Sequence, residues 1–183
     1  MKIGITGGIG SGKSYVCDRL CALGIDVYDC DAAAKALLAH SEELKVRICT
    51  LIGDDAYVGN VLNKKVIAKF LLNSEANAQK IDNIVHPMVA ADFIRSGSQW
   101  MECAIMFESG FNQLVDKVIC VTAPEEIRIV RVMKRDGIQR YKVMQWIGRQ
   151  WSQDRVRRMS DYEIVNDGIV DIDIQIKEIL NTI

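Results

Sequence analysis

The stretch Gly7-Gly8-Ile9-Gly10-Ser11-Gly12-Lys13-Ser14 decides the fold of this 183-residue chain. It follows the apolar run Lys2–Thr6, which predicts a strand, and a helical pattern begins where it ends. Its glycines leave the loop nearly bare of side chains, so backbone N–H groups can approach phosphate oxygens closely. A glycine-rich loop that ends in Lys-Ser between a strand and a helix is a P-loop, which binds nucleotide phosphates.

The residues of this loop have distinct expected roles. Lys13 would reach the β- and γ-phosphates of a nucleotide, and Ser14 would place its hydroxyl on Mg²⁺. The positive end of the following helix favours the anion further. The alternative is a glycine-rich turn with a chance Lys-Ser, and the order of strand, loop and helix argues against it. The expected ATP contacts here are Gly8, Ile9, Gly10, Ser11, Gly12, Lys13, Ser14 and Tyr15.

Length and composition indicate one compact α/β domain with a small insertion. Hydrophobic residues make up 49% and charged residues 26% of the chain, which argues against a disordered or fibrous protein. No apolar stretch is long enough to span a membrane, and the chain opens into a strand without a cationic leader. We therefore expect a cytoplasmic protein without a membrane partner. The sequence leaves the oligomeric state open, with a monomer among the options.

The six cysteines fit a reducing compartment, because most of them stand in apolar strand or helix patterns. Cys17, Cys21 and Cys30 are close in sequence, but no second pair or neighbouring His completes a tetrahedral metal site. A disulfide framework is not expected.

Strands and helices alternate along the chain, which predicts a parallel sheet. The strand candidates are Lys2–Thr6, Ile25–Tyr28, Trp100–Met106, Lys117–Thr122 and Tyr162–Val165. The helix after the P-loop carries Val16, Leu20 and Leu23 as an apolar stripe and ends before Gly24. The other helical patterns are Ala32–Leu38, Glu42–Leu51, Lys64–Leu72, Ala76–Ile84, Pro124–Arg135, Ile138–Gln150 and Asp171–Leu180.

The stretch from about Gly53 to Ser98 has no strand candidate and interrupts the alternation. We expect a helical insertion that forms the wall of a second substrate's site, since ligands of open α/β sheets bind beyond the carboxyl ends of the strands. Ordinary crossover helices are the alternative. The expected organisation is a core of residues 1–53, 99–133 and 151–183, a helical substrate subdomain at about 54–98, and a lid at about 134–150.

The lid falls within a basic segment. Ten Lys or Arg residues and only two Asp lie between Arg128 and Arg158, although the net charge of the whole chain is −1. Such a segment suits nucleic acid, a membrane surface or a polyphosphate, and the P-loop favours the polyphosphate. No aromatic-rich platform or recognition helix accompanies the charge, so no nucleic-acid partner is expected.

Acidic residues follow two of the predicted strands. Asp29 and Asp31 come after the second strand, where a carboxylate can orient an attacking hydroxyl or accept its proton. We expect Asp31 to do this, while either Asp is also suited to cap the next helix. Glu102 and Glu108 flank the apolar run Cys103–Phe107, and Glu108, beyond the end of the third predicted strand, is the better placed to bind a substrate hydroxyl or the Mg²⁺ shell. A helix N-terminal glutamate is the alternative for Glu108.

Two arginines stand four residues apart on one predicted helix. Arg131 and Arg135 can therefore point to the same side, which we expect to face the nucleotide, where arginine stabilises charge on a transferring phosphoryl group. A solvated helix face is the alternative. His86-Pro87 has the pattern of a helix start, and Asn166-Asp167-Gly168 has that of a turn which can also touch a base.

Taken together, these segments resemble the dephospho-CoA kinase family over essentially the whole chain. The matching segments, in order, are Ile5–Ser14, Asp29-Cys30-Asp31, His86-Pro87, Phe107-Glu108-Ser109-Gly110, Arg135-Asp136-Gly137, Asp161-Tyr162 and Asn166-Asp167-Gly168. The P-loop alone would not identify the family, whereas the ensemble does.

The resemblance implies an adenylate-kinase-like P-loop kinase with a five-stranded parallel sheet flanked by helices, a helical CoA-binding insertion and a small lid. It implies transfer of the γ-phosphoryl group of ATP to the ribose 3′-hydroxyl of dephospho-CoA, with Mg²⁺. The residues matching catalytic positions are Asp31 as the base, Lys13 and the lid residue Arg135. Asn166 matches the adenine-side loop, and Arg135 also contacts ATP. The expected acceptor-binding residues are Asp31, His86, Glu108 and Arg131.

The chain departs from the family pattern in three places, one of which is a short segment between His86 and the third strand, where acceptor contacts are expected. Glu102, Cys103 and Ala104 replace the family's Asp-Ile-Pro, and a lid arginine of the family falls at Trp146, with Arg149 three residues later. A kinase of the same fold acting on a nucleoside or nucleotide is the nearer alternative. A nucleotide-dependent switch is the more distant one, because the stretch 63–66 lacks the final Asp of the guanine-binding signature.

Overall fold

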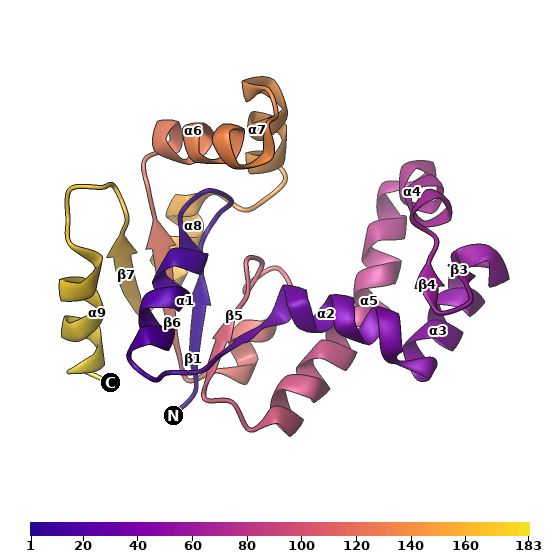
Figure 1. The fold of residues 1–183 in the computed structure, drawn as a ribbon, viewed down its shortest axis with the longest axis horizontal. Coiled ribbons are helices and arrows are strands. Elements are labelled where there is room, and N and C mark those ends of the chain that lie inside the picture. Colours follow the sequence, from indigo (N-terminus) through magenta and orange to yellow (C-terminus); the bar gives the residue numbers. More distant parts are fainter. The chain divides into compact units, whose positions relative to one another are not determined.

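The computed structural model describes residues 1–183 except for the side chain of Glu75. It forms two compact units (Figure 1), which we call the core unit, Met1–Tyr28 with Ser98–Ile183, and the helical unit, Asp29–Gly97. The predicted helical subdomain began at residue 54. The compact helical unit begins earlier, so the two helices that precede residue 54 belong to it.

Five strands form one parallel sheet in the order β2-β5-β1-β6-β7, which confirms the predicted sheet. Figure 1 labels β5, β1, β6 and β7 among them. Their bounds are β1 (Ile3–Thr6), β2 (Val27–Asp29), β5 (Trp100–Glu102), β6 (Lys117–Thr122) and β7 (Tyr162–Val165). In the centre, Ile3 of β1 stands opposite Trp100 of β5 and Lys117 of β6. The third strand was predicted to reach Met106, but the chain turns after Glu102, and Ser109 N–H bonds Ile105 C=O at 2.9 Å.

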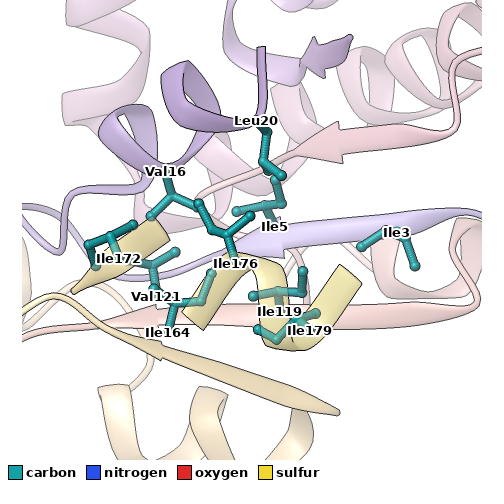
Figure 2. Close-up of a cluster of buried hydrophobic side chains, with 10 residues drawn as sticks. All are labelled: Ile3, Ile5, Val16, Leu20, Ile119, Val121, Ile164, Ile172, Ile176 and Ile179. Atoms are coloured by element: carbon teal, nitrogen blue, oxygen red, sulfur yellow. The ribbon is translucent and has the colours of Figure 1, made fainter. Parts of the chain in front are cut away.

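The helices of the core unit are α1 (Lys13–Ala22), α6 (Glu125–Asp136), α7 (Arg140–Ile147), α8 (Gln153–Met159) and α9 (Ile172–Leu180). A short 3₁₀ helix, η2, spans Phe111–Leu114. Helices α1 and α9 pack side by side on the sheet (Figure 2). The buried cluster drawn there consists of Ile3, Ile5, Val16, Leu20, Ile119, Val121, Ile164, Ile172, Ile176 and Ile179. This packing fixes the helix that follows the P-loop.

Three sequence-based details of these helices were wrong. Leu23, predicted on the buried stripe of α1, is 53% exposed because it is the C-cap, where the helix has already ended. Helix α7 is shorter than predicted, since residues 138 and 139 are not helical and a turn follows Ile147. Helix α8 was not predicted at all, although Ser152 caps it by accepting a hydrogen bond from Arg155 N–H at 3.3 Å.

The helical unit contains α2 (Cys30–His40), α3 (Glu42–Ile52), α4 (Lys64–Asn73) and α5 (Glu75–Ser96). Between α3 and α4 lie the 3₁₀ helix η1 (Asp54–Ala56) and the antiparallel strands β3 (Tyr57–Val58) and β4 (Val61–Leu62). No strand was predicted here, because two-residue strands leave no periodic pattern. Leu44 and Ile48 of α3 are buried, and Tyr57 donates its hydroxyl hydrogen to Leu38 C=O at 2.8 Å.

Helix α5 is much longer than the predicted Ala76–Ile84. It passes through His86 and Pro87, which the sequence suggested as a helix start. The side chains of Val85, Val89 and Phe93, each four residues apart, are all buried. Proline removes one helical hydrogen bond, and the continuous apolar stripe outweighs that loss.

None of the helices in the described part of the chain has both the length and the apolar character needed to cross a membrane.

Candidate functional site

The P-loop connects β1 to α1 and has the backbone that its glycines were expected to permit. Gly7, Gly10 and Gly12 all have positive φ, and Gly12, at φ 93°, immediately precedes α1. A β-carbon at Gly12 would lie 2.0 Å from Asn166 Nδ2, and one at Gly10 would lie 2.5 Å from Arg128 C=O. Glycine is therefore required at both positions by conformation and by space.

Lys13 begins α1 and points to a carboxylate of the neighbouring strand. Its Nζ lies 3.6 Å from Oε1 of Glu102, the last residue of β5, and both side chains are largely buried, with 12% and 15% exposed. Strands β1 and β5 are paired, so the P-loop and Glu102 emerge at the same edge of the sheet. Ser14 follows in the first turn of α1 and is exposed.

A hydrogen-bonded network joins the P-loop to the loop after β7. Asn166 is buried and donates from Nδ2 to Ser11 C=O at 3.0 Å. Arg131 of α6 donates to Asn166 Oδ1 at 3.1 Å and to Ser11 C=O at 3.4 Å. Asn166, Arg131 and the P-loop are thus brought together.

An open pocket of about 650 Å³ lies beside this network. Its lining residues are Gly12, Tyr15, Arg131, Asn166 and Gly168–Asp173. The predicted turn after β7 forms one wall, since Asp167 Oδ1 accepts hydrogen bonds from the N–H groups of Ile169 and Val170 at 2.8 and 3.0 Å. The side chains on this wall are partly apolar, which suits the flat ring of a base next to a phosphate loop.

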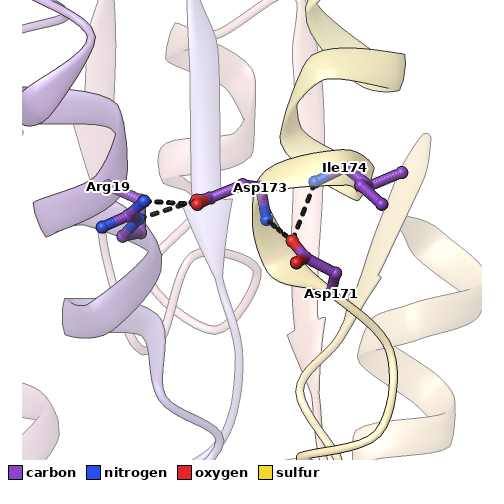
Figure 3. A network of polar contacts seen from close by, with 4 residues as sticks. All are labelled: Arg19, Asp171, Asp173 and Ile174. Carbon is purple, nitrogen blue, oxygen red and sulfur yellow. Dashed lines mark hydrogen bonds and ion pairs between the residues drawn. The ribbon is translucent and has the colours of Figure 1, made fainter.

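A polar network stabilises the same wall (Figure 3). Asp171 caps α9 by accepting from Asp173 N–H and Ile174 N–H. The Asp173 carboxylate accepts two hydrogen bonds from Arg19 of α1, the Nε bond being 2.7 Å long, and Arg19 holds the pKa of that carboxyl below its ordinary value. The helix that begins at the P-loop and the helix that borders the pocket are therefore linked.

Two predicted site residues of the core unit make other contacts. Arg135 does not join Arg131; its exposed guanidinium binds the neighbouring Asp136 in a bidentate pair at 2.7 and 2.8 Å. Glu108 is not at a helix N-terminus but accepts a hydrogen bond from Trp151 N–H at 3.2 Å. It thereby ties the segment after α7 to the edge of the sheet.

Asp29, Asp31 and His86 belong to the helical unit. Asp29 caps α2, and its Oδ1 accepts from Ala32 N–H at 2.9 Å. Asp31 stands in the first turn of α2 and is exposed, and Asp29, not Asp31, caps the helix. His86 lies on α5 with Nε2 3.7 Å from Oδ1 of Asp82.

Two further residues contact the P-loop and were not assigned there from the sequence. Arg128 of α6 donates from Nε to Ile9 C=O at 2.9 Å, and Gln150 accepts from Ile9 N–H at 2.8 Å. For Arg128 a signal existed, since it stands three residues before Arg131 on the same helix. For Gln150 there was none, because a glutamine in a polar turn has no distinctive pattern.

The family comparison decides what this site belongs to. The family model described as dephospho-CoA kinase matches residues 1–171. The chain belongs to the dephospho-CoA kinase family. Among curated members of that family, the Bacteroides fragilis protein is 36% identical over 187 residues, which cover 98% of this chain and 91% of that one. The Porphyromonas gingivalis member is 40% identical over 176 residues, 91% and 86% of the two chains.

Solved structures share the fold of this chain. The crystal structure of TT1252 from Thermus thermophilus matches with a TM-score of 0.85 at 29% identity, over all of this chain and 97% of the other. Dephospho-CoA kinase from Campylobacter jejuni matches with a TM-score of 0.65 at 21% identity, covering 100% and 96%, and supports the fold. Shikimate kinase from Acinetobacter baumannii, at 0.55 and 16% identity over 99% and 91% of the chains, shares the P-loop kinase fold.

Proposed function

We propose that this chain transfers the γ-phosphoryl group of ATP to the ribose 3′-hydroxyl of dephospho-CoA, giving CoA and ADP in the last step of CoA biosynthesis. The observation that carries the proposal is a complete P-loop, which includes Lys13 and accepts a hydrogen bond from Asn166, in a chain that matches the dephospho-CoA kinase family over residues 1–171. The enzyme acts in the cytoplasm without nucleic acid or membrane as a partner.

The donor nucleotide binds along the core unit. Its phosphates take hydrogen bonds from the P-loop N–H groups and the ammonium of Lys13. Its base occupies the pocket between Tyr15 and the turn after Asn166. Arg131 was expected to bind the acceptor, but it lines this pocket and bonds Asn166, so we assign it to the nucleotide.

The donor set around Lys13 fits a magnesium ion that arrives with the nucleotide. Mg²⁺ takes hard oxygen ligands and is held by one or two protein groups together with substrate phosphates. Ser14 offers a hydroxyl and Glu102 a carboxylate here, and the described residues contain no group of three or more His, Cys, Asp or Glu that would cage a metal without phosphate. When bound, the ion neutralises charge on the β- and γ-phosphates.

The expected acceptor contacts are Asp31 and His86 of the helical unit and Glu108 of the core unit. The 3′-oxygen attacks the γ-phosphorus as the bond from that phosphorus to the β–γ bridging oxygen breaks, and ADP leaves with the bridging oxygen. The Asp31 carboxylate orients the hydroxyl and accepts its proton. The support for this role is its exposed position in α2, with Asp29 serving as the cap.

Residues 134–150 act as the lid. Arg135 would stabilise the charge on the transferring phosphoryl group, and to do so its guanidinium exchanges the Asp136 carboxylate for phosphate oxygens. A carboxylate and a phosphate both present a pair of anionic oxygens, so the Arg135 guanidinium can bind either one with the same bidentate geometry.

Release of ADP from Mg-ATP in the presence of dephospho-CoA tests the function. The purified protein should release ADP and form CoA, and the Lys13→Ala variant, assayed beside it, should lose nearly all of this activity. Adenosine and AMP are tested as competing acceptors. Equal or faster turnover of either would favour a nucleoside or nucleotide kinase, and no ADP release above that of Lys13→Ala would reject kinase activity on these acceptors.

A further inference from the structure

The peptide groups on either side of Ile9, at the tip of the P-loop, are held from two directions. The Ile9 N–H donates to Gln150 Oε1 at 2.8 Å, and the Ile9 C=O accepts from Arg128 Nε at 2.9 Å. The Ile9 side chain packs against the buried cluster of Ile129, Val132 and Val143, which α6 and α7 share. The tip of the loop is therefore joined to the predicted lid through its backbone and its side chain.

Arg128 is an unusual group to find at this place. It is only 4% exposed, and burial lowers the pKa of its guanidinium, which nevertheless stays charged at neutral pH. Among the described residues, no carboxylate lies within ion-pair distance of it. Burying a cation is costly unless it is compensated, and an anion on the adjoining loop would compensate it. A β-carbon on Gly8 would lie 2.5 Å from Arg128 Nη2, so the charge lies directly against the P-loop.

Gln150 stands where the predicted lid returns to the sheet. The next residues are anchored at the same edge, since Trp151 N–H bonds Glu108 at 3.2 Å and Gln153 Oε1 accepts from Ala123 N–H at 3.1 Å. Ile9 follows β1, Glu108 follows β5 and Ala123 follows β6. The segment 150–153 thus crosses the carboxyl ends of three strands, and its first contact is the P-loop itself.

We propose that Arg128 and Gln150 are positioning residues for ATP. Together they fix the peptides around Ile9, so that the loop N–H groups are already oriented when the triphosphate arrives. Because Gln150 ends the lid segment, the geometry of the loop depends on that segment. This inference rests on the proposed function only in that ATP is the ligand, and the contacts that carry it all lie within the core unit.

Hydrogen exchange of the Ile9 amide, measured by NMR without nucleotide, tests the contact directly. Gln150→Met keeps the length of the side chain but removes the acceptor, and we expect Ile9 exchange to accelerate about tenfold with the loss of one hydrogen bond. Gln150→Glu retains a carbonyl-type acceptor and should restore slow exchange. Gln113→Met, an exposed position on η2, is the matched control and should leave Ile9 unchanged.

ATP binding by calorimetry and steady-state kinetics then separate positioning from simple stability. For Gln150→Met we expect the ATP dissociation constant to rise about five- to tenfold and the KM for dephospho-CoA to stay unchanged. Its melting temperature should equal that of Gln113→Met. Arg128→Lys keeps the charge but not the Nε geometry, and it should weaken ATP similarly. The proposal would be overturned if the Ile9 amide exchanged faster while ATP affinity stayed unchanged. It would also be overturned if ATP affinity, the KM for dephospho-CoA and the melting temperature all worsened together.

If the protein phosphorylated no acceptor, Ile9 amide exchange and ATP affinity would still test the proposal.

Discussion

The ammonium of Lys13 lies 3.6 Å from the carboxylate of Glu102, and both side chains are largely buried. The P-loop lysine and the last residue of β5 therefore form one charged pair at the carboxyl edge of the sheet. Removing one partner of a buried pair leaves the other charge uncompensated. In the proposed function, a bound triphosphate would compete with Glu102 for the ammonium of Lys13.

Glu102→Gln should separate ATP binding from turnover. Without the carboxylate, Lys13 has no competing anion, so we expect ATP to bind about threefold to tenfold more tightly in the absence of Mg²⁺. Turnover with Mg-ATP should fall by about tenfold or more, because an oxygen ligand for the metal is lost. Calorimetry in EDTA and a Mg²⁺ titration of ADP release measure the two effects. Glu178→Gln, exposed on α9, is the control, and a parallel loss of binding and turnover would contradict the prediction.

Gly12→Ala and Gly24→Ala distinguish backbone strain from collision. Both glycines have positive φ, 93° and 81°, so either substitution should cost about 1–3 kcal/mol in stability. Only at Gly12 does the added carbon meet another group, Asn166 Nδ2, which bonds Ser11. We expect Gly12→Ala to abolish measurable ATP binding and Gly24→Ala to retain it. Similar ATP affinity in the two variants would show that the Asn166 contact does not shape the site.

Much of the donor site could be predicted from the sequence because its signals are local. The P-loop, the strand before it and the turn at Asn166 each have their own residue pattern, and the structure joins them through Ser11. The role of Arg131 depended on a contact 120 positions away in the chain, which helical spacing alone does not reveal. The spacing predicted Arg131 and Arg135 on one face of the helix, but the Arg135 side chain binds the adjacent carboxylate of Asp136.

The wrong predictions about the fold also arose where contacts between distant residues outweigh a local sequence signal. Pro87 is a local signal for a helix boundary, and the buried stripe of Val85, Val89 and Phe93 is a tertiary one that outweighs it. The hairpin of β3 and β4 is too short for periodicity to reveal. The position of Gln150 against the P-loop depends on the path of the whole lid segment, so no single pattern in the sequence could have predicted it.

Asp31→Asn tests the proposed catalytic base against its neighbour. We expect turnover to fall about a hundredfold or more, with ATP affinity unchanged, because the amide cannot accept the hydroxyl proton. Asp29→Asn is the matched control, since asparagine caps a helix as well as aspartate does and should leave turnover nearly intact. Turnover and calorimetry on both variants decide the assignment. A larger loss in Asp29→Asn than in Asp31→Asn would reverse it.

The Arg19–Asp173 pair should make the stability of the nucleotide pocket depend on pH. The hydrogen bonds from Arg19 lower the pKa of Asp173 from its ordinary value of 3.8. A carboxyl with a lowered pKa stabilises the folded state fully above its ordinary value, and this contribution is lost as the pH falls through the lowered one.

Asp173→Asn should therefore melt about 1–2 °C below the unmodified protein at neutral pH, a small effect because both side chains of the pair are about 40% exposed. The difference should shrink progressively below about pH 4 as the Asp173 carboxylate is protonated. Melting curves across this range measure it, with Asp18→Asn, exposed on α1, as the control. A difference that stayed constant down to the acid limit of folding would mean that Asp173 stabilises the α1–α9 contact through its packing and not through its charge.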